Sequence, residues 1–303
     1  MNKAIEDFGR LDTEQRNPRT SDLDALSTAD LLATLHAENA VVQEAVSAAL
    51  PAVCLVVDAV SERLARGGRL FYVGAGTSGR LGVLDASECP PTFGVPPEMV
   101  QGIIAGGYPA LTGAVEAVED DVEAGAREAQ ARGVGERDAM IGIAASGRTP
   151  FVIGALRQAR AAGAFTAALS NVSIPAIGAH ADVTILAVTG PEALTGSTRL
   201  KAGTAQKLIL NLISTAAMIR IGKVYGNLMV DVRATNEKLQ DRAERIVMEA
   251  ADVNRAEAET ALAGCGYEVK TAIVALTLRV GADEARSCLE AAGGHVRKAL
   301  LDS

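Results

Sequence analysis

The chain has 303 residues and a formal net charge of −8; 49 % of its residues are hydrophobic, but only 3 % are aromatic and none is Trp. This length suffices for one large domain and a small appendage, since domains commonly hold roughly 100 to 200 residues. The acidic balance and the lack of a long basic run disfavour nucleic acids and anionic membrane surfaces as partners. The core must be built from Ala, Val, Leu and Ile, as in helix-flanked parallel sheets.

Cysteine and histidine usage indicates neither a disulfide framework nor a metal centre. The four cysteines form no C-x-x-C pair, and the three histidines lie far apart. Widely spaced cysteines of this kind are typical of reduced, cytosolic proteins. Residues 1–7 lack the apolar core of a signal peptide, and no uncharged apolar run approaches about 18 residues. We therefore expect a cytoplasmic protein without a metal or a cofactor.

The N-terminal part is predicted to be an arm followed by helices. Residues 1–25 are polar and are interrupted by Asn17-Pro18, so they begin as an arm. Ser27 is suited to cap a short helix that runs to Glu38. Residues 40–66 show a long apolar pattern that Pro51 is able to break.

Short apolar runs then alternate with helical patterns. Strands are expected at residues 69–73, 100–104, 138–144, 164–169 and 183–188. Helices are expected at residues 80–86, 110–119, 150–162 and 201–222. This alternation is typical of an α/β fold with a doubly wound, parallel five-stranded sheet flanked by helices. Ligands bind such sheets beyond the carboxyl ends of the strands, so we expect the loops after the first, third and fifth strands to converge on a site.

The C-terminal part reads as a three-helix bundle. Strand patterns stop after about residue 245, and short helices are expected at residues 255–262, 267–279 and 282–291. A helix-turn-helix DNA reader is an alternative, but residues 249–303 hold six basic and nine acidic side chains, a balance of −3. This balance favours a packing or dimer-supporting module.

A glycine and hydroxyl loop follows the first predicted strand. Its sequence is Gly74-Ala75-Gly76-Thr77-Ser78-Gly79. The glycines let backbone N–H groups approach an anion, the two hydroxyls add donors, and the following helix turns its positive end toward the same place. Glu88 lies a short way along the chain in a proline-stopped turn. We therefore expect Gly76, Thr77, Ser78 and Gly79 to cradle a phosphate, with an acid/base group beside them.

This loop has three other interpretations: a dinucleotide fingerprint, a Walker loop and an ordinary strand-to-helix turn. The spacing of Gly74, Gly76 and Gly79 fits a dinucleotide fingerprint, but the following strand region at 100–107 ends without the acidic residue that a nicotinamide site needs. No Gly-Lys-Ser/Thr follows, so the loop is not a Walker loop. An ordinary strand-to-helix turn remains the alternative.

A second hydroxyl loop, Ser146-Gly147-Arg148-Thr149-Pro150, follows the third predicted strand. It opens a helix with proline in the first turn. Ser146 and Thr149 are suited to close on the same phosphate as Thr77 and Ser78. Simple helix capping is the alternative for each hydroxyl.

Four runs of the chain resemble N-acetylmuramic acid 6-phosphate etherases, a family that carries a sugar isomerase (SIS) domain. They are residues 13–18, 73–92, 189–204 and 227–232, so the resemblance covers nearly the whole chain. It implies a lyase of cell-wall sugar recycling that removes the lactyl ether from N-acetylmuramic acid 6-phosphate and gives N-acetylglucosamine 6-phosphate and D-lactate. It further implies elimination followed by hydration.

The resemblance assigns the chemistry to two glutamates. Glu88 matches the acid that assists lactate departure and later activates water, and Glu119 matches the second active-site carboxylate. Both tasks require groups with a pKa near neutrality, and burial beside a second carboxylate raises a glutamate toward that range. The alternative for Glu119 is a solvated acidic helix end, because it lies within the acidic run 116–121.

The third loop supplies further substrate contacts by the same resemblance. These residues are Glu192, Ser197, Thr198 and Lys201. Lys201 is suited to neutralise the phosphate or an enolate-like oxygen, and an exposed first-turn lysine is its alternative.

We expect three regions: residues 1–66 as an arm and helices that pack on the SIS domain, residues 67–245 as the SIS sugar-phosphate-binding domain, and residues 246–303 as a small helical bundle (UBA-like). The resemblance also implies a homodimer paired through SIS helices. A sugar-phosphate-binding regulator similar to glucokinase regulatory protein is the main rival, and an aldose–ketose isomerase is the third interpretation. Lactate release separates the etherase from both.

Overall fold

The structure is a computed structural model that describes residues 9, 11–113, 115, 117–232 and 237–301. Packing divides the chain into two compact units. The first comprises Met1–Ser87 and Glu98–Ser214, and the second comprises Glu88–Pro97 and Thr215–Ser303. The boundaries expected at residues 66 and 245 stay predictions.

The first unit is built on one parallel sheet of five strands, which confirms the predicted fold class. The strands are β1 (Leu70–Gly74), β2 (Val100–Ile104), β3 (Ala139–Ala144), β4 (Phe165–Ser170) and β5 (Val183–Leu186). Their order is β2-β1-β3-β4-β5, and every pair is parallel. The chain thus changes direction across the sheet between β1 and β3, whose carboxyl ends border the crevice where ligands bind in such folds.

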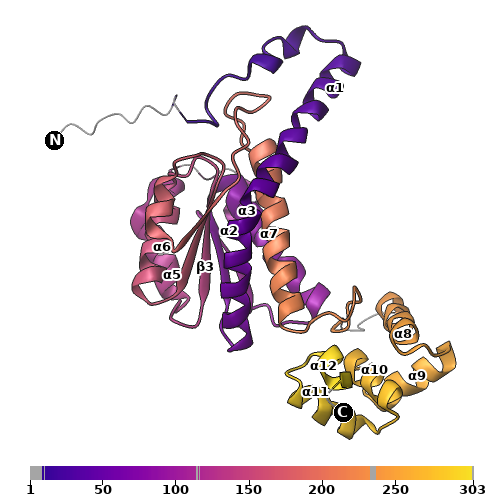
Figure 1. Ribbon diagram of the computed structural model, residues 1–303. Coiled ribbons are helices and arrows are strands. Elements are labelled where there is room, and N and C mark those ends of the chain that lie inside the picture. The colour runs from indigo at the N-terminus through magenta and orange to yellow at the C-terminus, as the bar shows by residue number, and fades with distance from the viewer. Residues whose placement is uncertain (1–8, 10, 114, 116, 233–236, 302–303) are drawn as a thin grey trace. The chain divides into compact units, whose positions relative to one another are not determined.

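Helices cover both faces of this sheet (Figure 1). On one face lie α5 (Val122–Ala131) and α6 (Pro150–Ala161), and on the other lies α2 (Ala40–Ala65), which contacts β3, β4 and β5. The core between the sheet and the α5–α6 layer consists of aliphatic side chains with two phenylalanines, Phe71 and Phe151. This composition matches a sequence rich in alanine and branched aliphatic residues and poor in aromatic ones.

The long N-terminal helices agree with the sequence interpretation in one respect and differ in another. α1 (Thr28–Glu38) begins after Ser27, whose hydroxyl accepts the N–H of Asp30, as expected for a cap. α2 continues through Pro51, so the break that this proline permits does not occur. By length and composition Thr28–Ala65 is able to cross a membrane, yet α2 buries one face, including Val56 and Val60, as a core helix does.

The expected helix at 110–119 is wrong. The described residues there form α4 (Pro109–Thr112) and a 3₁₀ turn (Val118–Asp120), while residues 114 and 116 lie outside the described part. Ala117 takes a left-handed φ of 62°, which no helix interior tolerates. Asp121 then caps α5, because its carboxylate accepts the N–H of Ala124. The sequence patterns did not indicate α5.

Two helices link the sheet to the second unit. α3 (Gly76–Phe93) contains the expected helix at 80–86 and extends beyond it at both ends. α7 (Lys201–Arg220) corresponds to the expected helix at 201–222.

The second unit is helical. It contains the three expected helices, here α9 (Arg255–Gly264), α10 (Val269–Leu278) and α11 (Ala282–Ala291), together with α8 (Glu237–Ala251) and α12 (Val296–Leu301). Asn254 and Glu257 form a reciprocal capping box that starts α9. The core of the bundle is aliphatic and includes Leu262, Ile273 and Val274.

We expect Gly154→Ala to lower the free energy of unfolding by about 3 kcal/mol, because overpacking of a closed helix contact forces the backbone apart. A Cβ on Gly154 of α6 would lie 1.8 Å from the carbonyl oxygen of Val122 in α5. Urea denaturation measures the change. Gly135→Ala is the matched control, since no heavy atom lies within 4 Å of its added Cβ and its φ is not left-handed. Equal stability of the two variants would show that α5 and α6 separate readily.

Candidate active site

The glycine loop after β1 forms a tight strand-to-helix turn. A Cβ on Gly74 would lie 2.7 Å from the nitrogen of Gly79, and one on Gly79 would lie 2.8 Å from the oxygen of Gly74. Gly76 is exposed, has a left-handed φ of 52° and opens α3. The first N–H groups of α3, which lack partners within the helix, thus begin at the carboxyl end of β1, a geometry suited to an anion.

Ser78 is buried in a hydrogen-bonded chain that the sequence did not reveal. Its Oγ donates to Oε1 of Gln206 at 2.9 Å, and Nε2 of Gln206 donates to Oδ1 of Asn171 at 2.9 Å. Nδ2 of Asn171 in turn donates to the carbonyl oxygen of Ala187 at 2.8 Å. The chain therefore ties α3 to α7 and to the ends of β4 and β5. Because the Ser78 hydroxyl donates its proton to Gln206, it must rotate before it can donate to a phosphate.

The second hydroxyl loop lies beside the first, because β1 and β3 are hydrogen-bonded neighbours. Oγ of Ser146 accepts the N–H of Arg148 at 3.4 Å. Thr149 stands at the N-cap position of α6, but its side chain makes no capping hydrogen bond. The capping alternative therefore does not describe Thr149. Gly147 holds the turn with a left-handed φ of 67°.

The third loop, residues 189–200, ends at a buried charged cluster. Both carboxylate oxygens of Glu192 accept N–H groups at the start of α7, those of Lys201 at 3.0 Å and Ala202 at 2.9 Å. Burial raises the pKa of Glu192, and the two N–H bonds oppose this rise. Lys201 is 1 % exposed, and its Nζ lies 2.7 Å from Oε2 of Glu38. Lys201 is thus not an exposed first-turn lysine.

Ser197 and Thr198 lie half-buried in the same loop. Their backbone N–H groups donate within the loop, to the oxygens of Leu194 and Gly196 respectively. The loop is therefore folded on itself before it enters α7. Contacts of these residues, of Glu192 and of Lys201 with a substrate stay predictions.

The two predicted catalytic glutamates are exposed. Glu88 lies on α3 in the second unit, and Glu119 lies in the 3₁₀ turn before α5 in the first unit. Exposed carboxylates are open to a ligand or to another chain, and their pairing stays a prediction. Among the described residues, no three His, Cys, Asp or Glu side chains are grouped to hold a metal ion.

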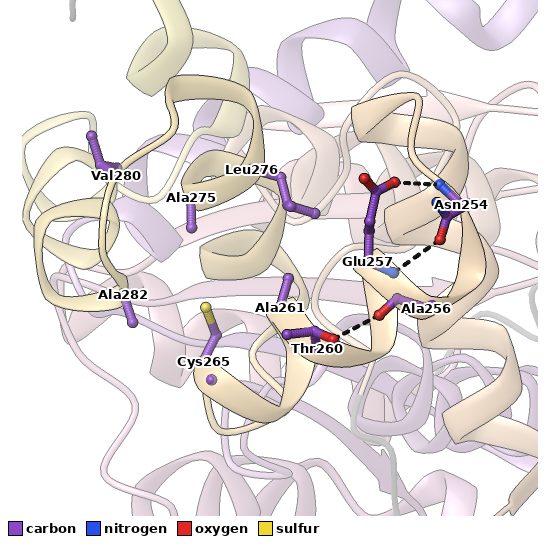
Figure 2. A pocket seen from close by; sticks show the side chains of 11 residues that line it. Asn254, Ala256, Glu257, Thr260, Ala261, Cys265, Ala275, Leu276, Val280 and Ala282 are labelled. Carbon is purple, nitrogen blue, oxygen red and sulfur yellow. Dashed lines mark hydrogen bonds between the residues drawn. The ribbon is translucent and has the colours of Figure 1, made fainter.

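A pocket of about 540 Å³ in the second unit is separate from these residues. It lies between α9, α10 and α11, and its wall includes Ala261, Leu276 and Val280 (Figure 2). Its polar rim contains the Asn254–Glu257 capping box. No predicted site residue lines it.

Comparisons with known proteins place the chain in a family. The family model of the glucokinase regulatory protein N-terminal SIS domain matches residues 52–160. A phosphoheptose isomerase from Neisseria gonorrhoeae has a similar structure, with a TM-score of 0.49 and 19 % identity over 63 % of this chain and 98 % of that one. The N-acetylmuramic acid 6-phosphate etherase of Yersinia pestis (strain Pestoides F) is 56 % identical over 97 % of this chain and 99 % of its own. The N-acetylmuramic acid 6-phosphate etherase of Klebsiella aerogenes is 55 % identical over 98 % of this chain and 99 % of its own. The chain therefore belongs to the N-acetylmuramic acid 6-phosphate etherase family.

Proposed function

We propose that this protein cleaves the D-lactyl ether of N-acetylmuramic acid 6-phosphate, giving N-acetylglucosamine 6-phosphate and D-lactate in cell-wall sugar recycling. The observation that carries the proposal is identity of 55–56 % with the Klebsiella and Yersinia etherases over almost the whole of each chain. The reaction is proposed to occur in the cytoplasm and without a cofactor. Purified protein that releases lactate from this substrate in the presence of a chelator would support it, and absence of lactate would refute it.

The chemistry is an elimination followed by a hydration. In the open-chain sugar, C2 lies next to the aldehyde, so its proton is acidic enough for Glu119 to remove. Lactate then leaves from C3 as Glu88 gives its proton to the ether oxygen, and a C2–C3 double bond forms. Water adds to C3 with its proton returning to Glu88, and C2 regains a proton from Glu119. Both carboxyl groups end in their starting states, as general acid/base catalysis requires.

The 6-phosphate is proposed to bind at the start of α3. The N–H groups and hydroxyls of the first loop provide donors, and Ser146 and Thr149 approach from the neighbouring loop. The tight Gly74–Gly79 turn supports this, because it begins α3 at the carboxyl end of β1. The third loop is proposed to complete the site. Its residues are Glu192, Ser197, Thr198 and Lys201.

The protein is proposed to work as a homodimer. Leucines on three helices of the first unit remain exposed, namely Leu50 and Leu55 of α2, Leu84 of α3 and Leu212 of α7. Leu55 is 60 % exposed. Exposed apolar side chains on several helices are typical of an interface, and a second copy of the chain is the partner that this family resemblance implies.

A non-catalytic sugar-phosphate-binding regulator is the second candidate. The match of residues 52–160 to the glucokinase regulatory protein SIS domain is the feature that it shares with this chain, whereas identity with the etherases over almost the whole chain favours the enzyme. Such a protein would bind the sugar phosphate and release no lactate. An aldose–ketose isomerase would exchange the C2 proton and also release no lactate.

We expect Glu88→Gln to abolish lactate release while sugar-phosphate affinity stays within about tenfold, because the amide keeps the size of the side chain but transfers no proton. A lactate assay and calorimetry measure the two effects. Glu98→Gln, at another exposed glutamate, is the control and should keep full activity. Normal turnover by Glu88→Gln would remove Glu88 from the mechanism.

Ser78→Ala should weaken binding of the 6-phosphate by about 1 to 3 kcal/mol if the hydroxyl turns from Gln206 to the anion. Unphosphorylated N-acetylmuramic acid is the control ligand, and its weak affinity should not change. Ser87→Ala is the control variant, because the exposed hydroxyl of Ser87 donates to the oxygen of Leu84 within α3. Equal losses for both ligands would show that Ser78 supports the fold through Gln206 and leaves the phosphate to other donors.

Isotope labels report the order of the steps. If elimination precedes hydration, a reaction run in heavy-oxygen water places the heavy oxygen at C3 of the product. A reaction run in deuterium oxide places deuterium at C2. Product without label at C3 would exclude elimination, because direct displacement at the lactyl carbon keeps the sugar's own oxygen.

Glu119→Gln should slow solvent exchange of the C2 proton by roughly a hundredfold or more, as loss of a general base does. Nuclear magnetic resonance of the substrate in deuterium oxide follows the exchange. Asp120→Asn, at the adjacent exposed carboxylate, is the control. Unchanged exchange in Glu119→Gln would transfer the role of base to another residue, with Glu192 the next candidate.

A further inference from the structure

Glu38, the last residue of α1, is a buried carboxylate with three side-chain partners. It is 4 % exposed, and its oxygens accept from Nδ2 of Asn17 at 2.7 Å, from Nε of Arg19 at 2.6 Å and from Nζ of Lys201 at 2.7 Å. These contacts lower the pKa of Glu38 to about 2, chiefly through the Arg19 hydrogen bond and against the effect of burial. Glu38 therefore stays ionised throughout the neutral range.

The partners of Glu38 come from two distant parts of the chain. Asn17 and Arg19 belong to the N-terminal arm, whereas Lys201 begins α7. The arm also contacts the third loop directly. Nδ2 of Asn17 donates to the oxygen of Pro191 at 3.3 Å, and Oγ1 of Thr20 donates to the oxygen of Ala193 at 2.8 Å. Loop 189–200 is thus held by the arm near its beginning and by Glu38 at its end.

Stability alone does not account for this arrangement. A buried ion pair gains little over apolar side chains of the same size, because desolvation of both charges offsets their attraction. The charged groups instead fix geometry, because each hydrogen bond of Glu38 holds its donor in a defined position. The segment so fixed is the loop that carries Ser197 and Thr198.

We propose that Glu38 is a positioning residue of the active site, which holds loop 189–200 through Lys201 and the N-terminal arm so that Ser197 and Thr198 meet the sugar phosphate. This inference rests on the proposed function, because the contacts of Ser197 and Thr198 with substrate belong to that proposal. Glu38 itself does not touch substrate. Its effect is exerted on the conformation of the loop.

The test is Glu38→Gln, assayed for lactate release over a range of N-acetylmuramic acid 6-phosphate concentrations. We expect KM to rise by about tenfold or more while kcat stays within about threefold, because a loosened loop weakens binding. A merely structural role gives the opposite split, since a smaller folded fraction lowers the apparent kcat and leaves KM unchanged. Unchanged KM in Glu38→Gln overturns the proposal.

Hydrogen exchange gives a readout that does not depend on activity. Peptides from residues 189–200 should exchange faster in Glu38→Gln than in the wild type, while those from α8 to α12 should exchange at the wild-type rate. Glu62→Gln is the matched control, since Glu62 forms an exposed ion pair with Arg66 on α2. It should change neither KM nor exchange. Equal exchange of the loop in Glu38→Gln and Glu62→Gln overturns the proposal.

A milder variant decides the case if Glu38→Gln does not fold. Thr20→Val keeps the shape of the side chain and removes the two bonds that Oγ1 donates, to the oxygen of Ala193 at 2.8 Å and to that of Asn17 within the arm at 3.4 Å. Loss of the tie to the loop should raise KM about twofold to fivefold with kcat retained. An unchanged KM in this variant overturns the proposal. Failure of the wild-type protein to release lactate would instead refute the proposed function, and the exchange comparison would still test whether Glu38 holds the loop.

Discussion

The start of α3 lies against the end of β1 with no space for a side chain between them. A Cβ on Gly74 would lie 2.7 Å from the backbone nitrogen of Gly79. One turn further along α3, a Cβ on Gly82 would lie 2.8 Å from the Cβ of Tyr72 in β1. Close packing of this kind brings the N-terminus of α3 to the edge of the sheet. The proposed phosphate site depends on this, because N–H groups and the helix dipole act over only one turn. The strand order, in which β3 neighbours β1, then places the loop after β3 beside this site.

The start of α7 presents an electrostatic difficulty that two carboxylates resolve. A lysine in the first turn of a helix is unfavourable, since the helix dipole is positive there. Glu192 accepts N–H groups of that first turn, and Glu38 accepts from the lysine Nζ. Two buried carboxyl groups thus face one buried ammonium group and the helix end. Removal of either carboxylate would leave positive charge uncompensated in a dry environment, which costs far more than an exposed ion pair gains.

Local patterns allowed the sheet, most helices and the loops of the candidate site to be predicted. β1 and β3 are apolar at nearly every position because they are buried on both faces, so they were recognisable as strands. α5 was missed because the acidic run 116–121 was assigned to the end of the helix expected at 110–119. The left-handed φ of Ala117, which separates that region from α5, cannot be recognised in a sequence. The partners of Ser78 and Glu38 were missed for another reason. Gln206 is 128 residues from Ser78, and Lys201 is 163 residues from Glu38, so no periodicity connects them.

The contacts of the N-terminal arm also bear on the order in which the chain folds. Asn17 and Thr20 bond to Pro191 and Ala193, which lie 174 and 173 residues further along the chain. Closing so long a loop costs entropy before any contact compensates it, and synthesis proceeds from the N-terminus. The arm is therefore synthesised before β5 and α7 and finds its place only after they exist. A chain released before residue 201 has its sheet strands but lacks the lysine that anchors Glu38, so arm docking marks completion of the first unit.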